Sequence, residues 1–237
     1  MLKKAIKTLS LSLLFAASAS QATIVDYYDT IANGHSQFAS TVNGAGGTVG
    51  SVTLNGLNSG NFWDFGDFSI STTDGSSERI YQETNNASTG DMIRINPVDN
   101  NDNGAASGIT FTFDSAINAL GFEVGDWATC CFLPSELFIS FDGGTAIKVA
   151  SATQASDNPA TAAGGRNGDA FFVGAIDDSS TFTTVTFFGN GFGEILTAGG
   201  TVKYSAIEID SISVPEPSSI AILALSLIGL SLSRRKS

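Results

Sequence analysis

Short apolar runs alternate with stretches of Gly, Ser, Thr, Asn and Asp along most of the chain, and no long stretch keeps a helical period. Runs of this length, bounded by turn residues, are typical of strands in an all-β domain. The pattern predicts about ten strands, at 48–54, 68–72, 92–95, 109–113, 120–124, 137–141, 146–150, 171–175, 182–188 and 202–214. A segment at 28–39 is the one helical candidate between the two ends of the chain.

The alternation within single strands indicates which side chains face the core. Ile109, Phe111 and Phe113 alternate with threonines and therefore point to one face of their strand. In the predicted last strand, isoleucines between 207 and 212 alternate with two acidic residues, and a bulge near residue 211 restores the phase. One apolar and one solvated face predict a two-sheet antiparallel β-sandwich of jelly-roll type.

Turn residues mark the connections between these strands. Asp142-Gly143-Gly144 separates two strands and supplies residues that tolerate positive φ, which predicts a tight hairpin. Longer polar loops are expected at 55–67, 84–91, 99–107 and 152–169. No repeat of solenoid or propeller period is present, so 23–212 is predicted to be one domain.

The first 22 residues have the order of a secretory signal peptide. Lys3, Lys4 and Lys7 form a positive region, an apolar run follows at 9–17, and Ser20-Gln21-Ala22 supplies small residues for cleavage. We expect a signal helix at 1–22 that is cleaved after Ala22, with Ala19 as the second choice.

The last 25 residues combine a proline motif, an apolar run and a basic end. Val214-Pro215-Glu216-Pro217 precedes an apolar run at 220–232, and Arg234-Arg235-Lys236 follows it. Thirteen helical residues span about 20 Å, less than the roughly 30 Å of a hydrocarbon core, but flanking residues and snorkelling Arg and Lys side chains extend the span. We therefore predict a transmembrane helix whose basic end stays in the cytoplasm.

This tail resembles the PEP-CTERM sorting signal of Gram-negative bacteria. The resemblance covers 213–237 and rests on Val214, Pro215, Glu216, Pro217, Arg234 and Arg235. It implies that an exosortase recognises the tail and cleaves it near the Pro-Glu-Pro. The precursor would then be anchored in the inner membrane, and the product would reach the cell surface or an extracellular polysaccharide matrix, as in a biofilm. The prolines keep the motif extended, which suits a protease groove.

Charge restricts the partners of the exported part. Residues 23–217 contain five basic and 23 acidic side chains, which gives a formal net charge of −18. Nucleic acid is excluded as a partner, because its binding depends on Lys and Arg that neutralise phosphates. An acidic surface keeps a secreted protein soluble and attracts divalent cations.

Two sets of oxygen-bearing side chains are candidate calcium (Ca2+) ligands. Asp99, Asn101 and Asn103 follow the alternation of the first half of an EF-hand loop, although position twelve is Thr110 instead of Glu, which excludes a true EF-hand. Glu208 and Asp210 on the polar face of the predicted last strand, joined by Asp26, form the second set, which is proposed by analogy with jelly-roll domains.

Cys130 and Cys131 are adjacent and are the only cysteines. In an exported protein they form a vicinal disulfide, remain two free thiols, or bond to another chain. His35, the single histidine, follows Asn33-Gly34 and is expected on a surface turn, where it cannot complete a zinc site.

Catalytic residues are not evident. A Ser or Cys nucleophile would have only His35 as a base, and no Gly-x-Ser-x-Gly elbow surrounds a serine. Asp177-Asp178, or Asp64 with Asp67, could serve glycoside hydrolysis, but such pairs arise by chance in an acidic chain.

Aromatic side chains beside carboxylates give a candidate carbohydrate-binding surface. Trp63 next to Asp64, and Trp127 in a second loop, could stack on sugar rings. In the competing interpretation, which we favour, Phe62, Trp63 and Phe65 cap the open end of the sandwich core.

The sequence therefore predicts an exported, exosortase-sorted surface or matrix protein. Its domain would be a non-enzymatic module that associates with polysaccharide or builds the envelope layer. A secreted glycan-active hydrolase that uses paired carboxylates is the alternative.

Overall fold

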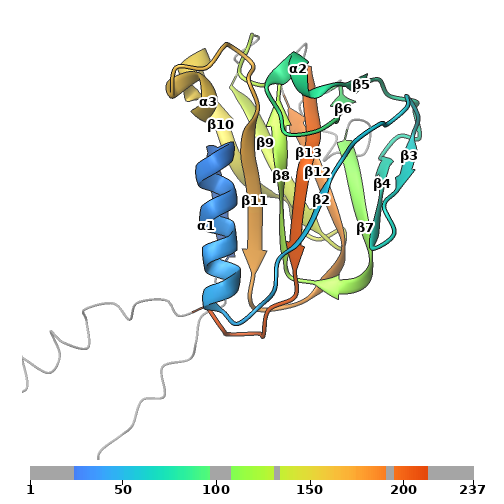
Figure 1. Cartoon of the computed structure of the whole chain (residues 1–237), viewed down its shortest axis with the longest axis vertical. Coiled ribbons are helices and arrows are strands. Elements are labelled where there is room, and N and C mark those ends of the chain that lie inside the picture. Colours follow the sequence, from blue (N-terminus) through green and yellow to red (C-terminus); the bar gives the residue numbers. More distant parts are fainter. Residues whose placement is uncertain (1–23, 97–107, 131–133, 191–194, 213–237) are drawn as a thin grey trace, which may run out of the picture.

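The computed structural model describes residues 24–96, 108–130, 134–190 and 195–212, and in them two antiparallel β-sheets pack face to face (Figure 1). One sheet has seven strands, in the order β1 (Ile24–Thr30), β11 (Phe171–Asp177), β8 (Ala119–Gly125), β13 (Leu196–Ser205), β6 (Met92–Ile95) and β5 (Ile80–Tyr81), with β2 (Gly50–Thr53) also paired to β13. The other has six, in the order β10 (Ile147–Ala152), β9 (Ser135–Phe141), β12 (Phe182–Asn190), β7 (Gly108–Ile117), β4 (Phe68–Thr72) and β3 (Phe62–Asp64). The predicted two-sheet antiparallel β-sandwich is confirmed.

The main core fills the space between the two sheets. Phe122 of β8 lies 5.0 Å from Phe111 of β7 and 4.9 Å from Phe187 of β12, measured between ring centroids. These rings join the seven-stranded to the six-stranded sheet. Ile109 and Phe113 are buried beside Phe111, so the inward face predicted for this strand is confirmed.

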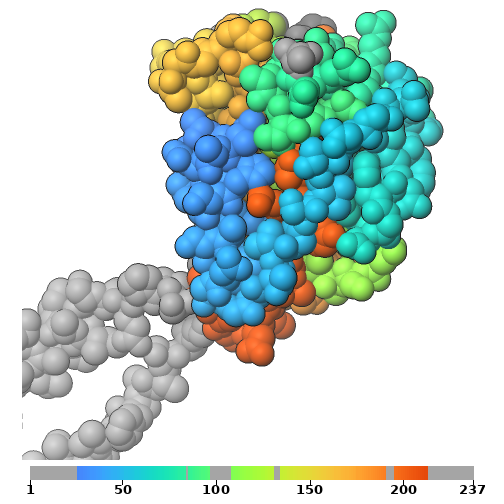
Figure 2. Space-filling view, viewed as in Figure 1, coloured from blue at the N-terminus to red at the C-terminus, as the bar shows by residue number. Residues whose placement is uncertain are grey.

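A second core lies on the outer face of the seven-stranded sheet, under helix α1 (Ile31–Gly44). Phe172 of β11 packs there against Phe38 and Tyr27, with ring centroids 5.9 and 6.4 Å away. Figure 2 shows α1 in blue and later segments in cyan and green, with β13 visible as orange patches between them. Strands β8 and β11 are therefore buried on both faces.

Two glycines make room for the Phe172 ring. A Cβ atom at Gly34 would lie 2.4 Å from Phe172 Cβ, and one at Gly121 would lie 2.2 Å from Phe172 Cζ. Both distances are far shorter than a van der Waals contact, so α1 and β8 can approach this ring closely only because these positions lack a side chain.

The two ends of the described domain lie at the same end of the sandwich. Ile24 pairs with Asp177, and the Ile212 N–H donates to the Asp178 carboxylate, so both chain ends leave beside the turn after β11 (Figure 1). The short helices α2 (Glu83–Asn86) and α3 (Pro159–Ala162), and the 3₁₀ turn η1 (Ala155–Asp157), lie at the opposite end.

Several predicted elements are confirmed in detail. Strands β4 and β6 have the predicted bounds, and β9 pairs with β10 through the predicted hairpin. Asp142 and Gly143 in its turn have φ angles of +46° and +70°, as a tight hairpin turn requires.

The predicted last strand at 202–214 is confirmed at 202–205 and wrong at 206–212. Strand β13 begins at Leu196 and ends at Ser205, and the chain then turns away from the sheet. Ile207 is buried against the α1 core, whereas Ile209 is 53% exposed. Alternation of isoleucines with acids therefore arises here from a turn whose Asp210 has a φ of +60°, and not from a pleated strand.

The prediction for the first described segment is also corrected. The helical candidate at 28–39 spans the end of β1 and the first part of α1, and His35 lies on this helix instead of on a surface turn. The turn signal of Asn33-Gly34 is overridden because Gly34 is the position at which α1 contacts Phe172.

Three predicted loops contain structure, and other predictions fall outside the described residues. The loop at 55–67 includes β3, the loop at 84–91 includes most of α2, and the loop at 152–169 includes η1 and α3. Within the described ranges no helix is both long and apolar enough to cross a membrane. The predicted signal helix at 1–22, the transmembrane helix in 213–237 and the loop at 99–107 lie outside those ranges.

We expect Gly121→Ala to lower the free energy of unfolding by about 1–3 kcal/mol, because the added methyl group overlaps the Phe172 ring. Gly44→Ala, at a helical position with no atom within 4 Å, should instead raise it by about 0.5–1 kcal/mol. Urea denaturation followed by tryptophan fluorescence measures both. Equal effects of the two substitutions would contradict the proposed role of Gly121.

Candidate functional site

The segment that follows β13, residues 206–212, is held on the end of the sandwich, and we refer to it as the docked C-terminal segment. Asn118, in the turn between β7 and β8, is fully buried and binds the main chain of Ile207 twice. Its Oδ1 accepts a hydrogen bond from Ile207 N at 2.8 Å, and its Nδ2 donates to Ile207 O at 3.0 Å. One amide side chain thus replaces the strand partner that Ile207 lacks.

Asp178 holds the other half of the docked C-terminal segment. Its carbonyl oxygen accepts from Asp210 N at 2.8 Å, and its Oδ2 accepts from Ile212 N at 3.0 Å. Asp178 itself is buried in the turn after β11. Ile207 packs in the α1 core and Ile212 packs against its edge, so apolar contacts and hydrogen bonds fix the same segment.

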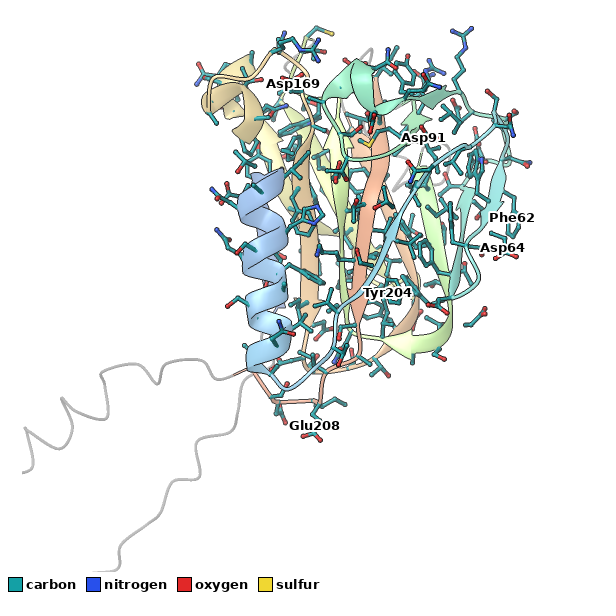
Figure 3. All side chains as sticks on the ribbon, in the orientation of Figure 1. Phe62, Asp64, Asp91, Asp169, Tyr204 and Glu208 are labelled. Atoms are coloured by element: carbon teal, nitrogen blue, oxygen red, sulfur yellow. The ribbon has the colours of Figure 1, made fainter. Side chains whose placement is uncertain are left out.

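The second calcium candidate lies on this segment. Glu208 is exposed at the lower end of the molecule in Figure 3, and Asp210 is also exposed. In the described part of the chain, no group of three or more His, Cys, Asp or Glu side chains is arranged to hold a metal ion. Asp99, Asn101 and Asn103 lie outside the described residues, so both calcium sites stay predictions.

The indole of Trp63 belongs to the core. Its side chain, on β3, is 8% exposed, and its Nε1 donates to Asn58 O at 2.9 Å. The neighbouring Phe62 is 60% exposed, and Asp64 points outward at the same sheet edge in Figure 3. Asp64 Oδ1 accepts from Gly66 N at 2.9 Å and so closes the turn after β3. The core-capping interpretation therefore fits Trp63 but not Phe62.

The indole of Trp127 is also enclosed. Trp127 is 0% exposed and packs edge-to-face on Tyr28, with ring centroids 5.9 Å apart. It also contacts Phe171 at 5.5 Å. A sugar ring needs an open aromatic face, so the burial of Trp63 and Trp127 removes the stacking surfaces that the predicted carbohydrate platform uses.

The cysteine pair lies at the boundary of the described residues. Cys130 lies in the loop after β8, and Cys131 lies outside the described ranges. The disulfide between them stays a prediction.

The carboxylates predicted as possible catalytic pairs have structural partners. Asp177 Oδ1 accepts from Ser179 N at 2.9 Å, and Asp178 binds the docked C-terminal segment. Asp67 Oδ2 accepts from the Tyr204 hydroxyl at 2.5 Å, a contact that links β13 to the other sheet. Each of these aspartates therefore stabilises a turn, a segment or the sheet pair.

A buried acid that the sequence analysis did not identify lies under α1. Glu123 on β8 is 0% exposed, and its carboxylate accepts from Thr89 N at 2.7 Å and Thr201 N at 3.1 Å. The Thr89 hydroxyl also donates to it. Glu123 lies between Phe122 and Val124 in the sequence, a pattern that is typical of a solvent-facing residue in an alternating strand. The sequence pattern therefore did not indicate that Glu123 is buried.

His35 approaches the same carboxylate. Its Nε2 lies 3.3 Å from Glu123 Oε1, close enough for an ion pair when the imidazole is protonated, but among the described residues this nitrogen makes no hydrogen bond. Glu123 thus joins α1, the segment at 87–91 and the bulge in β13. The carboxylate itself is fully buried, and its hydrogen bonds to two separate segments stabilise the fold.

Residues 213–236 match the family of PEP-CTERM protein-sorting motifs. The chain therefore carries this motif at its C-terminus, directly after the docked C-terminal segment. A motif of this family implies an exported protein that is anchored in the membrane, processed by an exosortase and sorted to the cell surface.

Two solved structures are similar to much of this chain. A mutant of CBM29-2, a family 29 carbohydrate binding module, matches 71% of this chain and 99% of its own, with 13% identity and a TM-score of 0.34. The catalytic domain of Agl-KA matches 72% of this chain and 31% of its own, with 14% identity and a TM-score of 0.34. Such weak similarity carries no argument about activity. Comparison with curated protein sequences found no match.

We expect Glu123→Ala to lower the free energy of unfolding by about 1–3 kcal/mol, because it leaves the buried Thr201 N–H without its acceptor and also removes the hydrogen bond from the Thr89 N–H. Glu136→Ala is the matched control: its pKa is lowered by a hydrogen bond from Lys148, but that pair is partly exposed and contributes at most about 1 kcal/mol. Urea denaturation compares the two variants, and similar losses would contradict a special role for Glu123.

Burial of the Tyr204 hydroxyl raises the pKa of Tyr204 to about 12, and the hydrogen bond to Asp67 and the negative charge of Asp67 contribute to the same shift. The folded state therefore holds this proton more tightly than the unfolded chain, whose tyrosine pKa is about 10. The resulting stabilisation is complete below pH 10 and is lost as the pH rises toward 12.

We expect Asp67→Asn to move the phenolate absorbance titration of Tyr204 to lower pH, whereas Asp64→Asn, which alters an exposed carboxylate at the end of β3, should leave it unchanged. Comparison with Tyr204→Phe identifies which part of the absorbance titration comes from Tyr204, because the other tyrosines are unchanged in that variant. An unchanged titration in Asp67→Asn would contradict the assignment.

Proposed function

We propose that this chain is an exported cell-surface or extracellular-matrix protein, sorted through its PEP-CTERM motif, whose β-sandwich is a non-enzymatic module that associates with extracellular polysaccharide or forms part of the envelope. The observation that carries the proposal is the sorting motif at 213–236, which follows a folded domain without an intervening spacer. A Gram-negative cell, a signal peptide at 1–22 and a transmembrane helix in the tail belong to the same proposal.

The surface chemistry supports a role outside the cell. The domain has far more acidic than basic residues, which keeps it hydrated and repels other polyanions. A polysaccharide partner would therefore be neutral, or would be bridged to the protein by divalent cations such as Ca2+. The jelly-roll character of the sandwich and the Cys130–Cys131 disulfide are further parts of the proposal.

The hydrolase alternative has no support from the described carboxylates. Asp67 and Asp178, one from each candidate pair, accept hydrogen bonds that hold Tyr204 and the docked C-terminal segment. Asp177 and Asp178 are also buried, whereas a catalytic carboxylate needs a face that is open to substrate. We therefore propose a non-enzymatic role.

The test is fractionation of the bacterium that makes the protein, with intact-mass measurement of the product. The natural protein should be shortened at both ends and recovered with the extracellular polysaccharide. Replacement of Pro215, Glu216 and Pro217 by Ala should leave a full-length tail in the inner membrane, because the recognition sequence is lost.

Glu208→Ala is the control, since it removes an exposed acid just before the motif and should be sorted normally. Natural protein that stays cytoplasmic, or triple-Ala protein that is shortened as usual, would contradict the proposal. Shortened protein that is recovered free of polysaccharide would exclude the association with polysaccharide, and the envelope role alone would remain.

A further inference from the structure

The sorting motif begins one residue after the last residue that the domain holds. Ile212 is fixed by its hydrogen bond to Asp178, and the matched motif starts at residue 213. Two residues separate Ile212 from Pro215, and the three steps from one Cα atom to the next span about 11 Å at most in an extended chain. The start of the Pro-Glu-Pro is therefore tethered within this distance of the domain.

A folded body of this size restricts access to so short a tether. A domain of about 190 residues has a radius of gyration of about 16 Å. An enzyme that cleaves near the Pro-Glu-Pro would have to fit between the cleavage site and the domain. That distance is shorter than the radius of the domain itself. The docked arrangement leaves little room for that approach.

The docked C-terminal segment also has its main chain occupied. Ile207 N and O bind Asn118, and the N–H groups of Asp210 and Ile212 bind Asp178. Enzymes that bind extended peptides do so through these same backbone groups. Residues upstream of the motif therefore cannot enter such a groove while they remain docked.

We propose that undocking of residues 206–212 from Asn118 and Asp178 precedes exosortase cleavage and sets its rate. This inference rests on the proposed function, because it assumes that the tail is cleaved. Cleavage breaks one peptide bond, and water supplies the hydroxyl of the new carboxyl group and the proton of the new amino group. The domain affects this step only by limiting how easily the exosortase reaches the cleavage site.

The docked segment is suited to reversible release because its contacts are few and lie at the margin of the fold. It follows the last strand, so its departure breaks no pairing within either sheet. Ile207 is its one residue buried in the α1 core, and Ile209 is already exposed. After cleavage the segment can dock again and shield the end of the sandwich.

The first test compares two buried asparagines in the full-length protein in its own bacterium. Asn118→Ala removes both hydrogen bonds to Ile207, and we expect pulse-chase labelling to show about tenfold faster conversion to the shortened form. Asn158→Ala removes bonds to Trp127 O and Asp169 O at the opposite end, and it should leave the rate unchanged.

A second variant keeps every contact of the docked segment. A Gly-Ser-Gly-Ser insertion between Ile212 and Ser213 lengthens the tether and should also speed conversion several-fold. The same insertion after Gly164, in the exposed loop that follows α3, should have no effect. The spacer variant keeps the test decisive if Asn118→Ala fails to fold.

Hydrogen exchange gives a readout that does not depend on cleavage. In the full-length protein, the amides of Ile207 and Ile212 should be protected in the natural chain and in Asn158→Ala. Both amides should exchange about tenfold faster in Asn118→Ala, because undocking exposes them.

The outcomes separate this inference from the proposed function. Natural protein whose C-terminal tail is never cleaved would overturn both the inference and the proposed function. Shortening at one rate in the natural protein, Asn118→Ala and the spacer variant would overturn the inference alone. Equal acceleration by Asn118→Ala and Asn158→Ala would also overturn it, because general destabilisation would then explain the effect.

Discussion

The packing of α1 on the outer face of the seven-stranded sheet is the contact on which the rest of this structure depends. Phe172 lies at its centre, between two glycines that leave no room for any larger residue. This contact buries β8 and β11 on both faces. It also creates the apolar surface that receives Ile207, so the position of the docked C-terminal segment follows from the position of the helix.

Short apolar runs predicted strands with one solvated face and also β8 and β11, which are buried on both faces, but the orientation of side chains was predictable only where one face is solvated. Ile109, Phe111 and Phe113 alternate with threonines, and the period-2 pattern gave their orientation correctly. The tight turn at Asp142-Gly143 was predictable because few residues tolerate positive φ. Local chemistry decides both features, so neither needs information about distant parts of the chain.

The features that sequence analysis misplaced depend on contacts between distant segments. Glu123 resembles a solvent-facing acid in an alternating strand, but α1 and the segment at 87–91 cover it. Ile207 and Ile212 resemble one face of a strand, yet Asn118 and Asp178 bind this segment through backbone groups that no residue pattern reveals. The tail was predictable because sorting enzymes read a linear motif, which matches residues 213–236.

The common exit of both chain ends determines how an anchored molecule faces its surroundings. A tether beside the turn after β11 directs the opposite end, with α2, α3 and the loop at 126–130, toward the medium (Figure 1). In that loop Asp126 and Ala128 both have positive φ, on either side of a buried tryptophan. The outward end of an anchored molecule would thus carry a loop whose main chain is fixed by the indole that it encloses.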